Sequence, residues 1–264
     1  MNAEQTINDI NNAENRAVKH HDTFVLVHGA WSSSYAWDFV KSGLIKHGHE
    51  VDALQLPGHG SDLTDIKDIN MNNYIEHVIK VLSAIDEKVI LVGHSMAGMI
   101  ISAVAEQVPE KIKQLVYIAA YVPMNGQSAY TISADDTQSL LGASLIVSAD
   151  QTRFDIKKDD IINIFCQDGA DEIKKLILDH YKVEPGIPFS NPVTLTDGRF
   201  GSVEKHFIET LQDHGIGNDL QKRMIKAAKI SHVYQINTGH SPFLSKPDEV
   251  VDILKAISNM GSQK

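Results

Sequence analysis

The sequence has almost no cysteine and no long hydrophobic run. Its 264 residues include one cysteine, Cys166, so an internal disulfide cannot form and the fold does not depend on an oxidising compartment. No apolar run approaches the roughly 20 residues that span a bilayer. Residues 1–22 are polar and rich in asparagine, without the apolar centre of a secretory signal peptide. We therefore expect a cytoplasmic protein whose residues 1–22 form a disordered or frayed tail.

Positive charge is also scarce. The 24 lysine and arginine residues are outnumbered by 34 aspartate and glutamate residues, which gives a formal net charge of −10. Nucleic acids and anionic membranes would repel such a chain. Thirteen histidines are present, but the CxxC and HExxH spacings that indicate metal sites are missing. We expect no nucleic-acid partner, no membrane partner and no metal. The oligomeric state stays open, with a homodimer among the assemblies that the sequence allows.

The arrangement of apolar runs predicts an α/β fold. Hydrophobic residues make up 42% of the chain, and short β-branched runs alternate with amphipathic helical patterns. Near-continuous apolar strands are typical of a parallel sheet that is covered on both faces. The pattern predicts a doubly wound, mostly parallel sheet of about six strands flanked by helices. The predicted strands cover residues 23–29, 50–56, 88–93, 114–120, 205–211 and 231–237.

Residues 121–203 interrupt this alternation. They contain mixed helical patches and turn-rich stretches such as "VEPGIPFSNPV", and no stretch that predicts a strand convincingly. Ligands of open α/β sheets bind at the carboxyl ends of the strands. We therefore predict an α/β core of residues 23–120 and 204–264, with residues 121–203 inserted as a mainly helical lid over those strand ends.

The stretch "VILVGHSMAG" (residues 89–98) places a serine at the end of an apolar strand. A nucleophilic serine on a strained strand-to-helix turn needs small neighbours, because the helix passes close to the strand. Gly93 and Ala97 meet that need around Ser95. A serine that merely caps the following helix would produce a similar local sequence. Both interpretations remain open from this stretch alone.

A serine hydroxyl becomes a good nucleophile when a base takes its proton and an acid orients that base. On a strand-to-helix turn of this kind, the partners follow in the order serine, acid, histidine. His240 comes directly after the last predicted strand, and Asp213 follows the strand before it. Glu209 is a rival acid but lies within its strand, and Asp219 is expected to open a helix. We therefore predict Ser95, His240 and Asp213 as the catalytic residues.

An ester-cleaving serine also needs two donors for the oxyanion. The backbone N–H groups of Ala30 and Met96 are the candidates, because they follow the first predicted strand and the serine. His59 in the turn "LPGHG" is not expected to act as a second base. The candidate substrate pocket, whose members could equally form the core of the lid, comprises Gly29, Trp31, Tyr121, Met124, Tyr130 and Phe165.

Five motifs carry a family resemblance: "FVLVHGAW", "LPGHGSD", "VILVGHSMAGM", "LVYIAAYVP" and "GHSPFLSKPDEV". They resemble the α/β-hydrolase superfamily, and most of all the plant methylesterase and hydroxynitrile lyase branch with its bacterial esterase relatives. The likeness runs from Phe24 to Ile257 and weakens in residues 121–203. It implies an enzyme without cofactors, whose triad matches Ser95, Asp213 and His240.

That branch contains two chemistries. Its hydroxynitrile lyases of the matching type carry threonine after the histidine of the first loop and lysine after the catalytic histidine, where this sequence has Gly29 and Ser241. Without the lysine, nothing holds a leaving cyanide. We therefore expect hydrolysis of a small to medium, largely apolar carboxylic ester through an acyl-enzyme. The alternatives are lyase-type C–C cleavage and a protein of this fold that binds ligand without catalysis.

Overall fold

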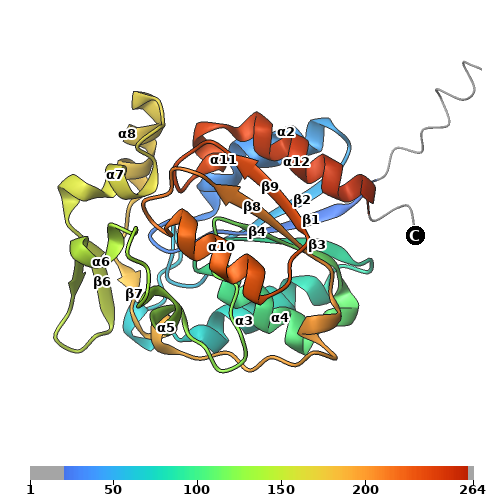
Figure 1. Cartoon of the computed structure of the whole chain (residues 1–264), viewed down its shortest axis with the longest axis horizontal. Coiled ribbons are helices and arrows are strands. Elements are labelled where there is room, and N and C mark those ends of the chain that lie inside the picture. Colours follow the sequence, from blue (N-terminus) through green and yellow to red (C-terminus); the bar gives the residue numbers. More distant parts are fainter. Residues whose placement is uncertain (1–20, 261–264) are drawn as a thin grey trace, which may run out of the picture.

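The computed structural model describes residues 21–260, so the predicted tail at 1–22 lies outside the described residues except for its last two positions. A six-stranded sheet in the order β2-β1-β3-β4-β8-β9 forms the centre (Figure 1). Every neighbouring pair in this sheet is parallel, which confirms the predicted architecture. The strands are β1 (Thr23–Val27), β2 (Glu50–Leu54), β3 (Val89–His94), β4 (Ile112–Ile118), β8 (Lys205–Thr210) and β9 (His232–Ile236).

Helices cover both faces of this sheet. Figure 1 shows α2 (Asp38–Lys46) and α12 (Pro247–Met260) on one face, and α3 (Met71–Ser83), α4 (Ala97–Gln107) and α10 (Asn218–Ala227) on the other. All residues of β1 and β3 are buried, as expected for central strands that are covered on both sides. None of the helices among residues 21–260 is long and apolar enough to cross a membrane.

Local sequence explains where these helices begin and what they bury. The side-chain oxygen of Asn70 caps α3 by accepting from the Asn73 backbone N–H. The side-chain oxygen of Asn73 in turn accepts from the Asn70 backbone N–H, which completes a reciprocal capping box. Helix α3 then buries one apolar stripe that includes Tyr74 and Val78. The remaining short helices of the core are α11 (Pro242–Ser245) and the 3₁₀ turns at Ser34–Trp37, Ile66–Asp68 and Pro109–Lys111; a further 3₁₀ turn, Phe200–Ser202, lies just before β8.

Residues 121–203, called the inserted segment below, contain both helices and strands. Three short strands form a second, antiparallel sheet in the order β5-β6-β7. The sequence did not predict these strands, because they are 3, 4 and 2 residues long and too short to show an alternating pattern. The elements are α5 (Ala129–Ser133), α6 (Leu141–Ser144), β5 (Leu145–Val147), β6 (Arg153–Ile156), a 3₁₀ turn (Lys158–Asp160), α7 (Ile161–Phe165), α8 (Asp171–His180), β7 (Glu184–Pro185) and α9 (Ile187–Ser190).

Candidate active site

Ser95 lies on a strained turn between β3 and α4. Its φ of 54° is in the left-handed region, which is costly for a residue with a side chain. The turn leaves no room for larger neighbours: a Cβ on Gly93 would lie 2.9 Å from the Ala97 carbonyl oxygen. The N-cap position of α4 is Met96, and no side-chain hydrogen bond caps this helix. The helix-capping interpretation of Ser95 is therefore wrong.

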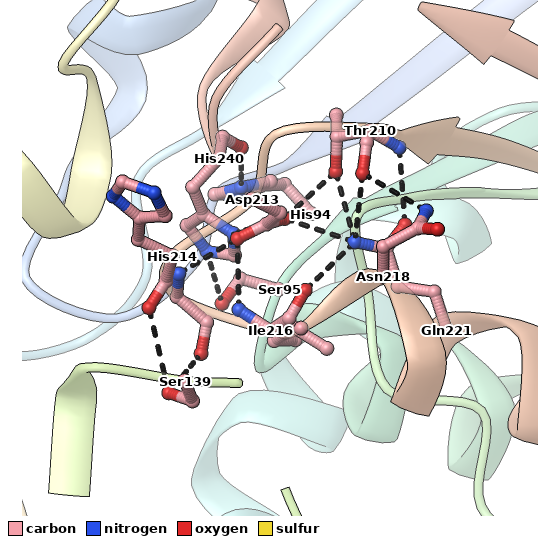
Figure 2. Close-up of polar contacts among 12 residues, drawn as sticks. His94, Ser95, Ser139, Thr210, Asp213, His214, Ile216, Asn218, Gln221 and His240 are labelled. Carbon is pink, nitrogen blue, oxygen red and sulfur yellow. Dashed lines mark hydrogen bonds and ion pairs between the residues drawn. The ribbon is translucent and has the colours of Figure 1, made fainter. Parts of the chain in front are cut away.

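Ser95, His240 and Asp213 form a hydrogen-bonded line (Figure 2). The Nε2 atom of His240 lies 3.0 Å from the Ser95 hydroxyl oxygen, and its Nδ1 atom lies 2.9 Å from both carboxylate oxygens of Asp213. Nδ1 faces only acceptors and therefore carries the proton, which leaves Nε2 free to accept the serine proton. The three residues follow β3, β9 and β8, so one edge of the sheet brings them together.

Asp213 is surrounded by donors. Its Oδ2 accepts from the Thr210 hydroxyl at 2.7 Å and from the Gln221 amide at 3.1 Å. Its Oδ1 accepts from the backbone N–H groups of Gly215 and Ile216 at 2.7 and 2.8 Å. A buried carboxyl group that meets only donors is stabilised in its charged form. Asp213 can therefore both orient His240 and stabilise its protonated ring.

The two rival acids have other partners. Glu209 is buried within β8 and accepts from the amides of Asn218 and Gln235, both at 2.7 Å. Asp219 lies in the first turn of α10 and pairs with Arg223 at 3.2 Å. The structure thus brings His240 to Asp213 rather than to either rival.

His94 contacts the backbone and the ring of His240. Its Nε2–H donates to the backbone carbonyl of His240 at 2.9 Å, and the two ring centroids are 4.6 Å apart. Its Nδ1 is buried and has no partner among residues 21–260. Burial, and then the proximity of His240, lowers the pKa of His94 well below its usual value. A neutral His94 therefore fixes the backbone that carries His240.

The loop after β1 passes directly against Ser95. A Cβ on Gly29 would lie 2.8 Å from the Cβ of Ser95. The Nδ1–H of His28 donates to the Gly29 carbonyl at 2.8 Å, while its Nε2 accepts from the Leu56 N–H at 3.2 Å. Burial lowers the pKa of His28 well below its usual value, so this tautomer is neutral. Because a trans peptide is planar, holding the Gly29 carbonyl also fixes the opposite direction of the Ala30 N–H.

The inserted segment also holds the loop that carries Asp213. The Ser139 hydroxyl donates to the Gly215 carbonyl at 2.7 Å (Figure 2). The Leu140 N–H donates to the His214 carbonyl at 2.9 Å. Farther along this loop, Asp136 accepts from the Gly217 N–H at 2.8 Å. The loop after β8 is therefore fixed from two sides, by the core through Thr210 and Gln221 and by the inserted segment.

A cavity of about 580 Å³ lies between the inserted segment and the loop after β1. Three of the predicted pocket residues line it, Trp31, Tyr121 and Tyr130, together with the rings of Phe154 and Phe189. The cavity is thus largely apolar and aromatic, as small-molecule sites commonly are. Most of this lining comes from the inserted segment.

The other predicted pocket residues lie elsewhere. Phe165 packs between Trp31 and His240, with ring centroids 5.7 and 6.0 Å away, and Gly29 touches Ser95 as described above. Met124 lines a separate hollow of about 710 Å³, and its side chain is 47% exposed. The structure therefore removes Met124 from the candidate substrate pocket.

Sequence reasoning missed Glu184. Its carboxylate is fully buried and pairs with His59 at 2.9 Å. The only local signal is an acidic residue within the turn-rich stretch "VEPGIP", which resembles an exposed loop. His59 is thereby held by the inserted segment.

A family model described as "Alpha/beta hydrolase family" matches residues 24–253. The chain belongs to this family, and within it to the methylesterase-like branch. Methylesterase 8 of Arabidopsis thaliana is 30% identical over 92% of this chain and 90% of its own length. Methylesterase 1 of the same plant is 29% identical over 91% of this chain and 97% of its own length.

Longer relatives are similar in sequence, and solved structures share the fold. The chain spans less than two thirds of the provisionally named chloroplastic methylesterases 11 and 13 of Arabidopsis thaliana, 64% and 60% of their lengths, and is 30% identical to each. Polyneuridine aldehyde esterase shares the fold with a TM-score of 0.82 at 24% identity, covering 90% of this chain and 99% of that one. The pyrethroid hydrolase PytH does so with a TM-score of 0.82 at 21% identity, covering 92% and 100%.

Proposed function

We propose that this protein is a carboxylic ester hydrolase that works through an acyl-enzyme on Ser95. The observation that carries the proposal is the hydrogen-bonded line from the Ser95 hydroxyl through His240 to Asp213, with distances of 3.0 and 2.9 Å. The names of the methylesterase relatives support the same class of reaction.

Acylation uses the groups already in place. The Ser95 oxygen attacks the ester carbonyl carbon while Nε2 of His240 takes its proton, and the imidazolium is stabilised by Asp213. The negative oxygen of the tetrahedral intermediate then meets the N–H groups of Ala30 and Met96, each worth about 3–4 kcal/mol. When the intermediate collapses, the C–O bond to the alcohol breaks and Nε2 returns its proton to the leaving oxygen.

Deacylation repeats these steps with water. Nε2 of His240 removes a proton from water, the hydroxide attacks the acyl carbon, and the acid leaves as Ser95 regains its proton. We assign the inserted segment the role of a lid that encloses the substrate, because it supplies most of the lining of the 580 Å³ cavity. Its aromatic walls favour small to medium, largely apolar esters.

The lyase alternative finds less support. Position 241 is a buried serine at the start of α11, so it supplies no positive charge beside His240. Cleavage of a cyanohydrin would leave cyanide without a cation to stabilise it. Hydrolysis needs no such group, because the leaving alcohol takes its proton from His240.

The test is ester turnover and serine labelling. We expect the wild-type protein to hydrolyse short p-nitrophenyl esters, and Ser95→Ala to lose activity by roughly 10³-fold or more. Ser83→Ala, which alters an exposed hydroxyl on α3, is the matched control. A fluorophosphonate should label Ser95 alone. Full activity of Ser95→Ala, labelling of another residue, or release of cyanide from mandelonitrile without ester turnover would each overturn the proposal.

A panel of esters and lactones with graded acyl and alcohol groups then defines the substrate class. Turnover that increases with apolar size up to the capacity of the cavity agrees with the proposed pocket. A protein that binds these compounds tightly but turns none of them over would instead be a ligand-binding member of the fold.

A further inference from the structure

Glu184 is a buried carboxylate that the triad chemistry does not use. Its side chain is 0% exposed, and its Oε2 accepts from the Trp31 backbone N–H at 2.6 Å and from Nε2 of His59 at 2.9 Å. Its Oε1 is buried and has no partner among residues 21–260. Burying a carboxylate is costly unless donors compensate it. The hydrogen bonds from Trp31 and His59 to Oε2 therefore compensate the burial of the Glu184 carboxylate.

The protonated, positively charged ring of His59 holds the Glu184 carboxylate in place. Its Nδ1 faces the Pro57 carbonyl at 2.9 Å and its Nε2 faces Glu184, so both ring nitrogens meet acceptors. Only the doubly protonated ring donates from both nitrogens. Burial acts to lower the pKa of His59, but the charge and hydrogen bond of Glu184 outweigh it, and the pKa is raised. The pair fixes the carboxylate at the position where it meets Trp31.

Two N–H groups of Trp31 donate hydrogen bonds to the second sheet. Its backbone N–H donates to Glu184 of β7, and its indole Nε1–H donates to the Phe154 carbonyl of β6 at 3.0 Å. Phe154 and Glu184 are paired across these two strands, so both contacts come from one rigid unit. The φ of Trp31 is 54°, a conformation that persists only when its surroundings impose it.

The peptide that Glu184 holds adjoins the peptide of the oxyanion donor. His28 fixes the Gly29 carbonyl, and with it the plane that contains the Ala30 N–H. Glu184 fixes the Trp31 N–H, which lies in the next peptide plane. Ala30 therefore lies between two restrained peptides, one held by the core and one by the inserted segment.

We propose that Glu184 is a positioning residue for the oxyanion hole: by accepting the Trp31 N–H, it aims the Ala30 N–H at the oxyanion. The inserted segment then contributes to the rate of the chemical step as well as enclosing substrate. This inference rests on the proposed ester hydrolysis, because only that reaction places an oxyanion beside Ala30.

Three substitutions of Glu184 distinguish its role as the acceptor of the Trp31 N–H from its role as the charged partner of His59. Glu184→Gln keeps an oxygen acceptor at the same distance from Trp31 but removes the charge, whereas Glu184→Asp keeps the charge and withdraws it by one methylene. Glu184→Leu removes the acceptor altogether. We expect kcat to fall roughly 10- to 100-fold in the Asp and Leu variants and within about 5-fold in the Gln variant, with KM changed less than about 3-fold.

Tyr181→Phe is the matched control. It removes a hydroxyl that bonds to Ile156 and Asp155 of the same second sheet, without touching Trp31. We expect its kcat to stay within about 2-fold of wild type, even if its thermal midpoint falls as far as that of the Leu variant. An equal loss of kcat in Tyr181→Phe would overturn the positioning role in favour of general loosening of the inserted segment.

Backbone amide measurements test the position of Ala30 independently of ester turnover. The backbone amide signals of Ala30 and Trp31 should shift, and their hydrogen exchange should accelerate, in the Asp and Leu variants but little in the Gln variant. Unchanged amides in the Asp variant, or kcat lower in Gln than in Asp, would overturn the inference. A wild-type protein that hydrolyses no ester would instead overturn the proposed function and leave the amide result to stand alone. If the Leu variant does not fold, the comparison of Gln with Asp still decides.

Discussion

Gly29 and Ser95 are in contact: a Cβ added to Gly29 would lie 2.8 Å from the Cβ of the nucleophile and 2.8 Å from Nδ1 of His94. Side-chain carbons do not approach one another this closely, so the loop after β1 can pass the serine only as glycine. The same contact places the following Ala30 N–H beside the proposed reaction centre.

Gly29→Ala is expected to lower kcat for short esters by roughly 10- to 100-fold, because the loop must move away from Ser95 and carries one oxyanion donor with it. Steady-state kinetics measure the effect. Gly198→Ala is the control, since a Cβ there meets no atom within 4 Å. Unchanged kcat in Gly29→Ala would show that the loop tolerates the displacement and that Ala30 is not the donor.

Asp213→Asn is expected to reduce kcat by about 10⁴-fold, because an amide at this position favours the wrong tautomer of His240. The buried donors around Asp213 would also lose a charged acceptor. Glu209→Gln changes another buried carboxylate, which lies within β8 four residues before Asp213, and should stay within about 3-fold of wild type. If both variants lose activity equally, Asp213 is not the orienting acid.

Gly142→Leu should change selectivity rather than abolish activity. Gly142 lines the 580 Å³ cavity, and a Cβ there meets no atom within 4 Å, so a larger side chain would fill part of the proposed substrate pocket. We expect kcat/KM for bulky esters to fall roughly 10-fold relative to acetate esters. The matched change Gly198→Leu should leave the ratio unaltered. A uniform loss across the ester panel would contradict the assignment of this cavity.

Stability should decline as the pH falls below about 6.5. His28 and His94 are buried with pKa values well below usual, so below that pH the unfolded chain binds protons that the folded chain does not. Each contributes a loss of up to about 1.4 kcal/mol in the free energy of unfolding per pH unit. His59 has the opposite sign: its raised pKa gives stability that is full below 6.5 and is lost as the pH rises through the folded value.

Urea unfolding at pH 5.5 and 7.5 measures this dependence. His94→Gln keeps a donor for the His240 carbonyl. It should reduce the difference in the free energy of unfolding between pH 7.5 and pH 5.5 by about 1 kcal/mol. The same substitution at the exposed His47 is the control. An unchanged difference in His94→Gln would mean that His94 is not buried in its neutral form.

The sequence was sufficient to predict the six-stranded core and the three residues of the hydrogen-bonded line. Apolar strands such as 88–93 have a clear signal, and in a parallel sheet the residues that follow the strands meet at one edge. The second sheet and the contact between Glu184 and Trp31 could not be predicted. That contact joins residues 153 positions apart and depends on a strand of two residues, which leaves no periodic pattern.

The order of the chain also determines when the site can first act. Strand β9 lies at the edge of the sheet and precedes His240, which is 145 positions after Ser95. During synthesis, Ser95 and its strained turn therefore emerge long before His240, the proposed base, and under the proposed mechanism the hydroxyl behaves as an ordinary alcohol until β9 joins β8. The proposed hydrolysis requires the last strand to dock, so the appearance of ester cleavage in a refolding reaction would time the closing of the sheet.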